Sequence, residues 1–269
     1  MRKTFSILLT VAAIMVMIGC VPTFAESNND AISVNWRETN PELASIFEKF
    51  AGGEVWQNND TLTDTEKHMI TIVSLVTQQS ETLLSDAVQA ALDAGVSPIE
   101  IQEAVYQCAP YCGYSRAVDA SVIADAIFTA NGIELPLEPQ ATVDENSRFK
   151  DGLDVQASIF GEGMRQAAAE PDQMPESSYY LVENCFGDHY TRGTLDTATR
   201  EMLTLAVLVN LGTESQMSAH IMGNLSVGRT PNAISDIIYQ CLPYAGYPRI
   251  LNALNVFSSV QEMMMQQSQ

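Results

Sequence analysis

The sequence has little positive charge, few histidines and few cysteines, and each shortage excludes a class of protein. Its 269 residues include 13 Lys and Arg against 33 Asp and Glu, a formal net charge of −20. Nucleic acids and anionic membrane surfaces require clusters of basic residues, so we expect neither as a partner. Five cysteines and three histidines are too few for a disulfide scaffold and show no metal-site spacing. A hydrophobic fraction of 46% excludes a disordered chain.

One long apolar run stands at the start of the chain. Arg2 and Lys3 precede an apolar stretch over 5–19, shorter than the roughly 20 residues that a membrane span needs. The pattern predicts a secretory signal peptide over 1–25. Lipoprotein processing, which would anchor the chain at Cys20, and an uncleaved membrane anchor are the alternatives. We therefore expect an exported protein, periplasmic or extracellular, with no membrane span in its mature part.

An internal repeat organises the remainder of the chain. Residues 62–128 align without gaps with residues 195–261, and 20 of the 67 positions are identical. The match is densest between 106–116 and 239–249, where 8 of 11 residues agree. A period of this length indicates a duplicated domain rather than a solenoid. We expect a spacer over 26–40, a first copy over 41–134, a linker over 135–147 and a second copy over 148–262.

Both copies carry the pattern of helices. Apolar residues recur at i, i+3, i+4 and i+7 from Met69, which places them on one helical face. Residues 97–100 (Ser-Pro-Ile-Glu) form a capping box with Pro at the first helical position, and we expect Pro110 and Gly113 to break the helix that follows. Another helix is predicted over 148–169. No stretch alternates as a strand would, so the predicted fold class is all-α.

A histidine and a glutamate of the second copy carry the strongest chemical signal. Thr213, Gln216 and His220 are spaced to share one helical face. Glu201 stands on the preceding helix, and a tight hairpin at Gly212 would bring it beside His220. A carboxylate on one imidazole nitrogen fixes the tautomer and leaves the other nitrogen for proton transfer. The alternative is a purely structural hydrogen bond.

These residues lie in a sequence that resembles the carboxymuconolactone decarboxylase family, which includes the alkylhydroperoxidase AhpD-like proteins. The resemblance rests on the stretch Arg-Gly-Thr-Leu-Asp-Thr-Ala-Thr-Arg-Glu at 192–201, the helix start at 228–231 and the turn Tyr-Ala-Gly-Tyr-Pro-Arg at 244–249. It covers nearly all of 41–261. It implies two tandem AhpD-like all-α domains, a small-molecule substrate, no cofactor and a homo-oligomer, with a trimer of two-repeat chains favoured.

The peroxidase branch of this family uses a Glu, a Cys-x-x-Cys pair and a His. Those positions correspond here to Glu201, Thr213, Gln216 and His220. Thr and Gln cannot supply the reactive thiolate and the resolving thiol, so thiol peroxidase chemistry is not expected at this site. In the first copy the Glu and His positions are His68 and Ala87, so we expect that copy to be degenerate.

The resemblance and the chemistry together suggest further site residues. We expect Arg192 to clamp a substrate carboxylate, Thr213 and Gln216 to donate hydrogen bonds to the substrate, and Tyr190 and Tyr244 to line the pocket. A solvated Arg and core Tyr side chains are the alternatives. The leading hypothesis is a cofactor-free lyase or isomerase-type enzyme that acts on a small carboxylate or lactone through a Glu–His proton relay.

Two other functions stay open. A redox protein of the AhpD type would have to use Cys112 or Cys185 in place of the missing pair. Such a protein would be classed at the family level as a peroxiredoxin. A non-enzymatic binding or assembly domain would use neither site. Cys108 and Cys241 are repeat equivalents that we expect to be buried. Disulfides between Cys108 and Cys112 or between Cys185 and Cys241 are compatible with export.

Overall fold

The computed structural model describes residues 35–267, and that part of the chain is helical without a strand. The all-α prediction is confirmed. The predicted signal peptide and Cys20 lie outside the described residues, so export stays a prediction. The chain divides into two compact units, one ending at Pro41 and one beginning at Glu42. In its described part the first unit holds α1 (Trp36–Thr39), and the second holds both copies of the repeat.

The first copy begins with short helices and continues with four long ones. Its elements are α2 (Pro41–Glu48), the π-helix η1 (Lys49–Val55), α3 (Trp56–Asn58), α4 (Asp64–Gln78), α5 (Glu81–Asp93), α6 (Pro98–Cys112) and α7 (Tyr114–Ala130). The capping box at Ser97 is present, with Glu100 as its partner. The first long helix has a second capping box, from Thr63 to Glu66. These caps fix where the helices start, because they satisfy backbone N–H groups of the first turn.

The second copy repeats this order after its own N-terminal segment. That segment contains α8 (Arg148–Phe160), α9 (Gly163–Ala167), the 3-10 turn η2 (Pro171–Gln173), α10 (Glu176–Tyr180) and the π-helix η3 (Leu181–Tyr190). The repeat itself contains α11 (Thr197–Leu211), α12 (Glu214–Ser226), α13 (Pro231–Gln240), α14 (Leu242–Ala245) and α15 (Tyr247–Gln267). Helices α11 and α12 are thus the counterparts of α4 and α5.

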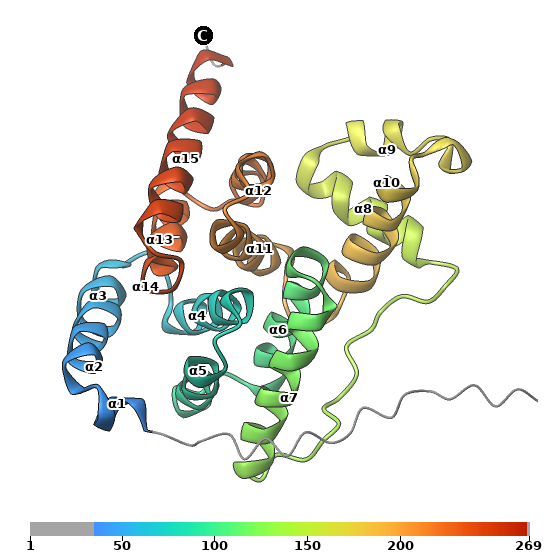
Figure 1. The fold of residues 1–269 in the computed structure, drawn as a ribbon. Helices are drawn as coiled ribbons and strands as arrows, with labels where there is room; N and C mark the ends of the chain where they lie inside the picture. The colour runs from blue at the N-terminus through green and yellow to red at the C-terminus, as the bar shows by residue number, and fades with distance from the viewer. Residues whose placement is uncertain (1–34, 268–269) are drawn as a thin grey trace, which may run out of the picture. The chain divides into compact units, whose positions relative to one another are not determined.

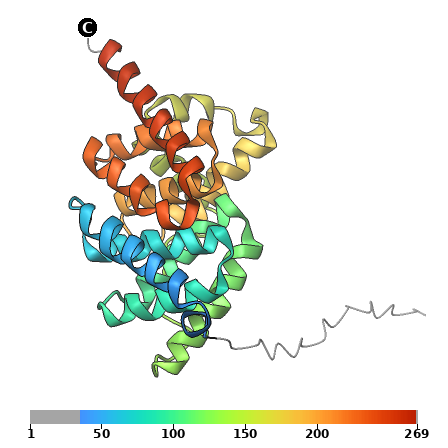
Figure 2. The same ribbon diagram turned by 60° about the vertical axis from the view of Figure 1, so that its left-hand side comes forward.

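The two copies share one hydrophobic core. The equivalent helices α4 and α11 pack against each other, α11 also packs on α6, and α4 packs on α13 and α14 (Figures 1 and 2). Their apolar side chains form a single buried cluster that draws on both copies. The linker over 135–147 therefore separates the copies in sequence but not in the core.

Repeat-equivalent hydrogen bonds mark the contact between the copies. The Nε2 atom of Gln107 on α6 donates to Oγ1 of Thr204 on α11, at 3.1 Å. The Nε2 atom of Gln240 donates in turn to Oγ1 of Thr71 on α4, at 3.3 Å. Each copy thus donates a hydrogen bond from its glutamine to the threonine of the other copy. The contact between the copies therefore repeats the duplication seen in the sequence.

Two predicted helix boundaries are wrong. Pro110 does not break α6, which continues to Cys112 and ends at Gly113 with φ of 94°. A proline in the last turn forfeits a single backbone bond, and packing of the helix on both copies compensates for it. The predicted helix over 148–169 is divided into α8 and α9 at Gly161, whose φ of 92° is readily adopted only by glycine.

Two glycines let α8 approach the π-helix η3 closely. A Cβ atom built on Gly152 would overlap the backbone of Val182 and Gly187, and one built on Gly187 would overlap the carbonyl group of Arg148. This contact forms a second, smaller apolar cluster whose buried members include Cys185, Phe186 and Tyr190. The sequence pattern had not identified η3 as a helix, yet it supplies one wall of the candidate site.

Candidate active site

The hairpin between α11 and α12 brings Glu201 and His220 together, as the spacing predicted. Gly212 ends α11 in the left-handed conformation, with φ of 75°. The Nδ1 atom of His220 lies 2.9 Å from Oε2 and 3.2 Å from Oε1 of Glu201. The carboxylate is fully buried, while 10% of the histidine side chain is exposed. Because Nδ1 faces the carboxylate, Nε2 is the nitrogen left for a substrate.

Two residues of α12 that the sequence reasoning missed support this pair. A Cβ atom on Gly223 would overlap the carboxylate of Glu201, so only glycine leaves room for it there. The Nδ2 atom of Asn224 donates to the backbone carbonyl groups of Glu201 and His220, at 2.9 and 2.8 Å, and so ties the two helices together. The sequence did offer a signal for Gly223: a glycine inside a predicted helix lowers helix stability and so indicates a packing or functional reason for its presence.

Tyr190 lies behind Glu201 rather than in the wall of the cavity, so its predicted place is wrong. Its hydroxyl group donates to Oε1 of Glu201 at 2.6 Å and lies 2.8 Å from Oγ1 of Thr204. Burial, reinforced by the negative charge of Glu201, raises the pKa of Tyr190 well above its ordinary value. The phenol therefore stays protonated and acts as a neutral donor to the carboxylate.

A cavity of about 570 Å³ opens beside His220. Its lining comes from both copies and is mostly apolar: Pro110, Tyr111, Gln156, Phe160, Met164, Leu181, Cys185, Phe186, Leu208, Leu211, Thr213, Gln216, Ala219 and His220. The imidazole ring is held edge-on between Tyr111 and Phe160, with ring centroids 5.7 and 5.4 Å away. This volume and lining suit a small organic molecule.

Thr213 and Gln216 both line the cavity, and the hydrogen bonds to a substrate that we expect of them stay a prediction. Thr213 precedes the first residue of α12, but its side chain does not cap that helix. Its hydroxyl oxygen is buried and makes no hydrogen bond within the described part of the protein. A buried hydroxyl group without a partner is costly, and a substrate oxygen would satisfy it.

Tyr244 does not reach the cavity, contrary to prediction. It lies on α14 and packs edge-on against Phe47, with ring centroids 6.5 Å apart. Its repeat equivalent Tyr111 takes the expected place, because α6 of the first copy, rather than α14 of the second, lies against α11 on the side of His220. The cavity is thus built from both copies of the repeat.

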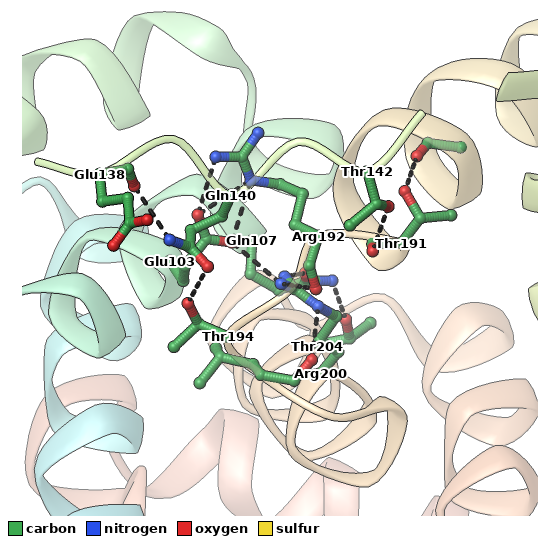
Figure 3. Close-up of polar contacts among 12 residues, drawn as sticks. Glu103, Gln107, Glu138, Gln140, Thr142, Thr191, Arg192, Thr194, Arg200 and Thr204 are labelled. Carbon is green, nitrogen blue, oxygen red and sulfur yellow. Dashed lines mark hydrogen bonds and ion pairs between the residues drawn. The ribbon is translucent and has the colours of Figure 1, made fainter. Parts of the chain in front are cut away.

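Arg192 is not available as a carboxylate clamp, which corrects a further prediction. Its Nη2 and Nε atoms lie 2.9 Å from Oε1 of Glu103, a fully buried carboxylate on α6 (Figure 3). Arg200, also fully buried, binds the other oxygen of Glu103 at 2.9 Å. The guanidinium group of Arg192 further lies over the ring of Tyr106. Arg192 neutralises an internal acid and is absent from the described residues that line the cavity.

The cysteines give no support to a thiol mechanism at this site. All four described cysteines are free, so neither of the two disulfides that export would allow is formed. Cys185 lines the cavity, but burial raises the pKa of its thiol to about 12, which keeps it protonated. A hydrogen bond from Cys108 lowers the pKa of Cys112, but Cys112 is not among the residues that line the cavity.

The first copy has no counterpart of the pair. His68, at the glutamate position, packs against Trp56 with ring centroids 4.8 Å apart, and burial lowers its pKa. Ala87 occupies the histidine position.

Within residues 35–267, no group of three His, Cys, Asp or Glu side chains could hold a metal ion. None of the helices in this range has the length and apolar character that a bilayer span requires.

Comparisons with known proteins agree with the repeat. The sequence model of the carboxymuconolactone decarboxylase family matches residues 41–126 and again residues 175–259. Over 120 residues the chain is 27% identical to the 4-carboxymuconolactone decarboxylase of Acinetobacter baylyi. The aligned residues make up 44% of this chain and 90% of that protein. Over 82 residues it is 30% identical to an uncharacterized 15.0 kDa protein of Paracoccus denitrificans, covering 30% of this chain and 61% of that one.

A solved structure from Burkholderia xenovorans, described as a gamma-carboxymuconolactone decarboxylase subunit, also aligns with the chain. The TM-score is 0.48 at 18% sequence identity, and the alignment covers 87% of this chain and 90% of the other.

Proposed function

Because the chain belongs to the carboxymuconolactone decarboxylase family, we propose that it is a cofactor-free enzyme of lyase or isomerase type. In this proposal Glu201 and His220 move a proton at a carbon next to a carbonyl group. One observation carries it: a buried carboxylate holds Nδ1 of His220 at 2.9 Å, and the same ring lines a cavity. The arrangement has the geometry of an oriented general base.

The reaction is proton transfer through an enolate. Neutral Nε2 of His220 takes a proton from the substrate carbon, the C–H electrons move into the carbonyl group, and an enolate and an imidazolium ion form. The carboxylate of Glu201 stabilises the imidazolium ion. The proton then returns to the same or a conjugated carbon, so atoms and electrons balance without an oxidant.

The cavity favours an uncharged substrate over a carboxylate. No Lys or Arg belongs to its described lining, and Arg192 and Arg200 are both bound to Glu103. A carboxylate that enters without a cationic partner loses hydration and gains little in return. Thr213 and Gln216 offer neutral hydrogen-bonding groups instead. We therefore expect a lactone or a related cyclic ketone as the substrate, rather than the small carboxylate that the sequence also suggested.

Deuterium incorporation tests this function directly. Lactones and cyclic ketones, each with and without a carboxyl group, are incubated with the protein in D₂O, and the signal of the α-proton is followed by NMR. The proposal expects catalysed exchange for uncharged members, with each methyl ester exceeding its parent acid. Exchange at the buffer rate for every compound would contradict it, and a preference for the acids would contradict the substrate class.

The thiol alternative is not favoured. Among the described cysteines Cys185 alone lines the cavity, and burial raises its pKa to about 12. Export and assembly are further proposals that rest on the sequence and on the family. N-terminal sequencing of the secreted chain would test cleavage after residue 25 against processing at Cys20. Light scattering of the mature protein would test the trimer.

A further inference from the structure

A continuous chain of hydrogen bonds links the first copy to the candidate catalytic pair. Gln107 donates to Oγ1 of Thr204 at 3.1 Å, Thr204 lies 2.8 Å from the hydroxyl group of Tyr190, and Tyr190 donates to Glu201 at 2.6 Å. A phenol has one hydrogen, and that of Tyr190 is given to Glu201. Thr204 must therefore donate to Tyr190 and accept from Gln107, so every hydrogen in the chain points toward Glu201.

The direction of this chain is fixed at its far end by the buried ion cluster. Nη1 of Arg200 donates to Oε1 of Gln107 at 2.9 Å, and Arg200 is held in turn by Glu103 (Figure 3). An arginine cannot accept a hydrogen bond, so the amide oxygen of Gln107 must face Arg200. Its NH₂ group is left to face Thr204.

A second branch also begins in the first copy. The hydroxyl group of Tyr111 on α6 donates to the oxygen of Tyr190 at 3.2 Å and accepts from the thiol of Cys185 at 3.3 Å. The titratable groups facing the Glu201–His220 pair are therefore Tyr111 from α6 and Cys185 and Tyr190 from η3. Burial raises the pKa of all three, so all are neutral donors at neutral pH.

We propose that the degenerate first copy supplies positioning residues for the site of the second: Gln107 orients Thr204, Thr204 orients Tyr190, and Tyr190 orients the carboxylate that holds His220. Aligned neutral donors stabilise the ionised carboxylate without adding charge, and each bond in such a chain strengthens the next. A role of these hydrogen bonds in catalysis rests on the proposed function, whereas their effect on the protonation of His220 does not.

The duplication provides a matched control for the test. Thr71 accepts from Gln240 just as Thr204 accepts from Gln107, but Thr71 has no connection to Glu201. Thr204→Val and Thr71→Val each leave one buried glutamine amide without its acceptor, so they disturb the fold alike. Only Thr204→Val interrupts the chain to His220.

The readout is the titration of the His220 ring, followed through its imidazole ¹⁵N signals in the full chain. Without the donation from Thr204, Tyr190 becomes a poorer donor, and Glu201 becomes more basic and holds the imidazolium ion more strongly. In Thr204→Val we expect the titration midpoint to rise by about half a pH unit, roughly a threefold change in the protonation constant. Thr204→Ser, which keeps the hydroxyl group, should restore the wild-type midpoint, and Thr71→Val should leave it unchanged.

Gln107→Met and Gln240→Met form a second pair and serve if a valine variant fails to fold. Because Gln107→Met also takes an acceptor from the buried Arg200, both are repeated in a Thr204→Ala background, where an effect transmitted through Thr204 disappears. A shift in the Gln107 variant alone that disappears in this background supports the inference. Equal shifts in both members of a pair, or no shift in either, would overturn it. The titration of His220 needs no substrate, so it tests the hydrogen-bond chain separately from the enzyme activity. If the midpoint shifts in Thr204→Val but no substrate shows deuterium exchange, the proposed function is wrong and the hydrogen-bond chain stands.

Discussion

At the scale of single residues, side-chain size around Glu201 and His220, the candidate catalytic pair, matters as much as chemistry. Gly223 is the clearest case, because any larger side chain there would overlap the carboxylate of Glu201. Its repeat equivalent in the first copy is Ala90, which faces no such carboxylate because His68 stands at the glutamate position. The glycine therefore belongs to the site and not to the fold of the repeat.

Replacing Gly223 by alanine should push Glu201 away from His220. We expect a loss of about 1–3 kcal/mol in the free energy of unfolding, from overpacking a filled core, and weaker coupling between the two side chains. Urea unfolding and the His220 ¹⁵N spectrum measure these effects. Ala90→Gly is the matched control and should leave the spectrum unchanged. An unaltered spectrum in Gly223→Ala would show that the contact does not depend on this glycine.

His189 should make the stability of the protein depend on pH. Burial, and next the positive charge of Arg192, lowers its pKa from 6.5 to about 4. Between these two pKa values, His189 is protonated in the unfolded state and neutral in the folded state. Stability should therefore be fully present above about pH 6.5 and fall as the pH decreases toward 4, by up to about 3 kcal/mol.

Chemical unfolding at pH 7 and at pH 4.5 measures this loss. In His189→Gln the difference between the two pH values should shrink relative to wild type. The burial of His68 also lowers its pKa, so the comparison is best made in a His68→Gln background. An equal difference with and without His189 would rule out this source of the pH dependence.

At the level of secondary-structure elements, local patterns predicted the repeat helices well. The cap at Ser97, the helix start at Thr230 and the hairpin at Gly212 involve only residues that are neighbours in sequence. The contact between Glu201 and His220 follows from that hairpin. The π-helix η3 could not be predicted in this way. It depends on the close approach of α8, which brings together glycines that are distant in sequence.

Gly152→Ala should disrupt this approach. The added methyl group would meet the backbone of η3, which cannot move without displacing Cys185 and Tyr190. We expect a loss of about 1–3 kcal/mol in stability together with weaker binding of any cavity ligand. Gly163→Ala is the control, since nothing lies near its Cβ position. Both are checked by thermal unfolding with and without ligand, and equal effects of the two substitutions would contradict the close-packing account.

At the scale of the whole molecule, the packing of one copy against the other decides which residues line the cavity. Arg192 binds Glu103, 89 residues earlier, and Tyr111 replaces Tyr244 in the cavity. No pattern within one copy indicates which surface of the other it will meet, so these partners could not be read from the sequence. The repeat predicted two domains, while the structure merges their cores.

The buried cluster that joins the copies should be essential for stability. Glu103→Gln removes the shared partner of Arg192 and Arg200 and leaves buried positive charge uncompensated, for which we expect a loss of about 3–5 kcal/mol. Among the described residues, Asp236, the repeat equivalent of Glu103, accepts only from Thr61, so Asp236→Asn should cost much less. Denaturant unfolding of both variants checks this, and comparable losses would show that the cluster has no special role.

In the function proposed above, Glu201 and His220 act as one acid–base unit. The most direct measurement compares the rate of α-proton exchange in D₂O for wild type, His220→Gln and Glu201→Gln with the best uncharged substrate. Both variants should lose about 100-fold or more, and the loss in the double variant should be little greater than in either single one. Exchange that continues undiminished in His220→Gln would contradict the account.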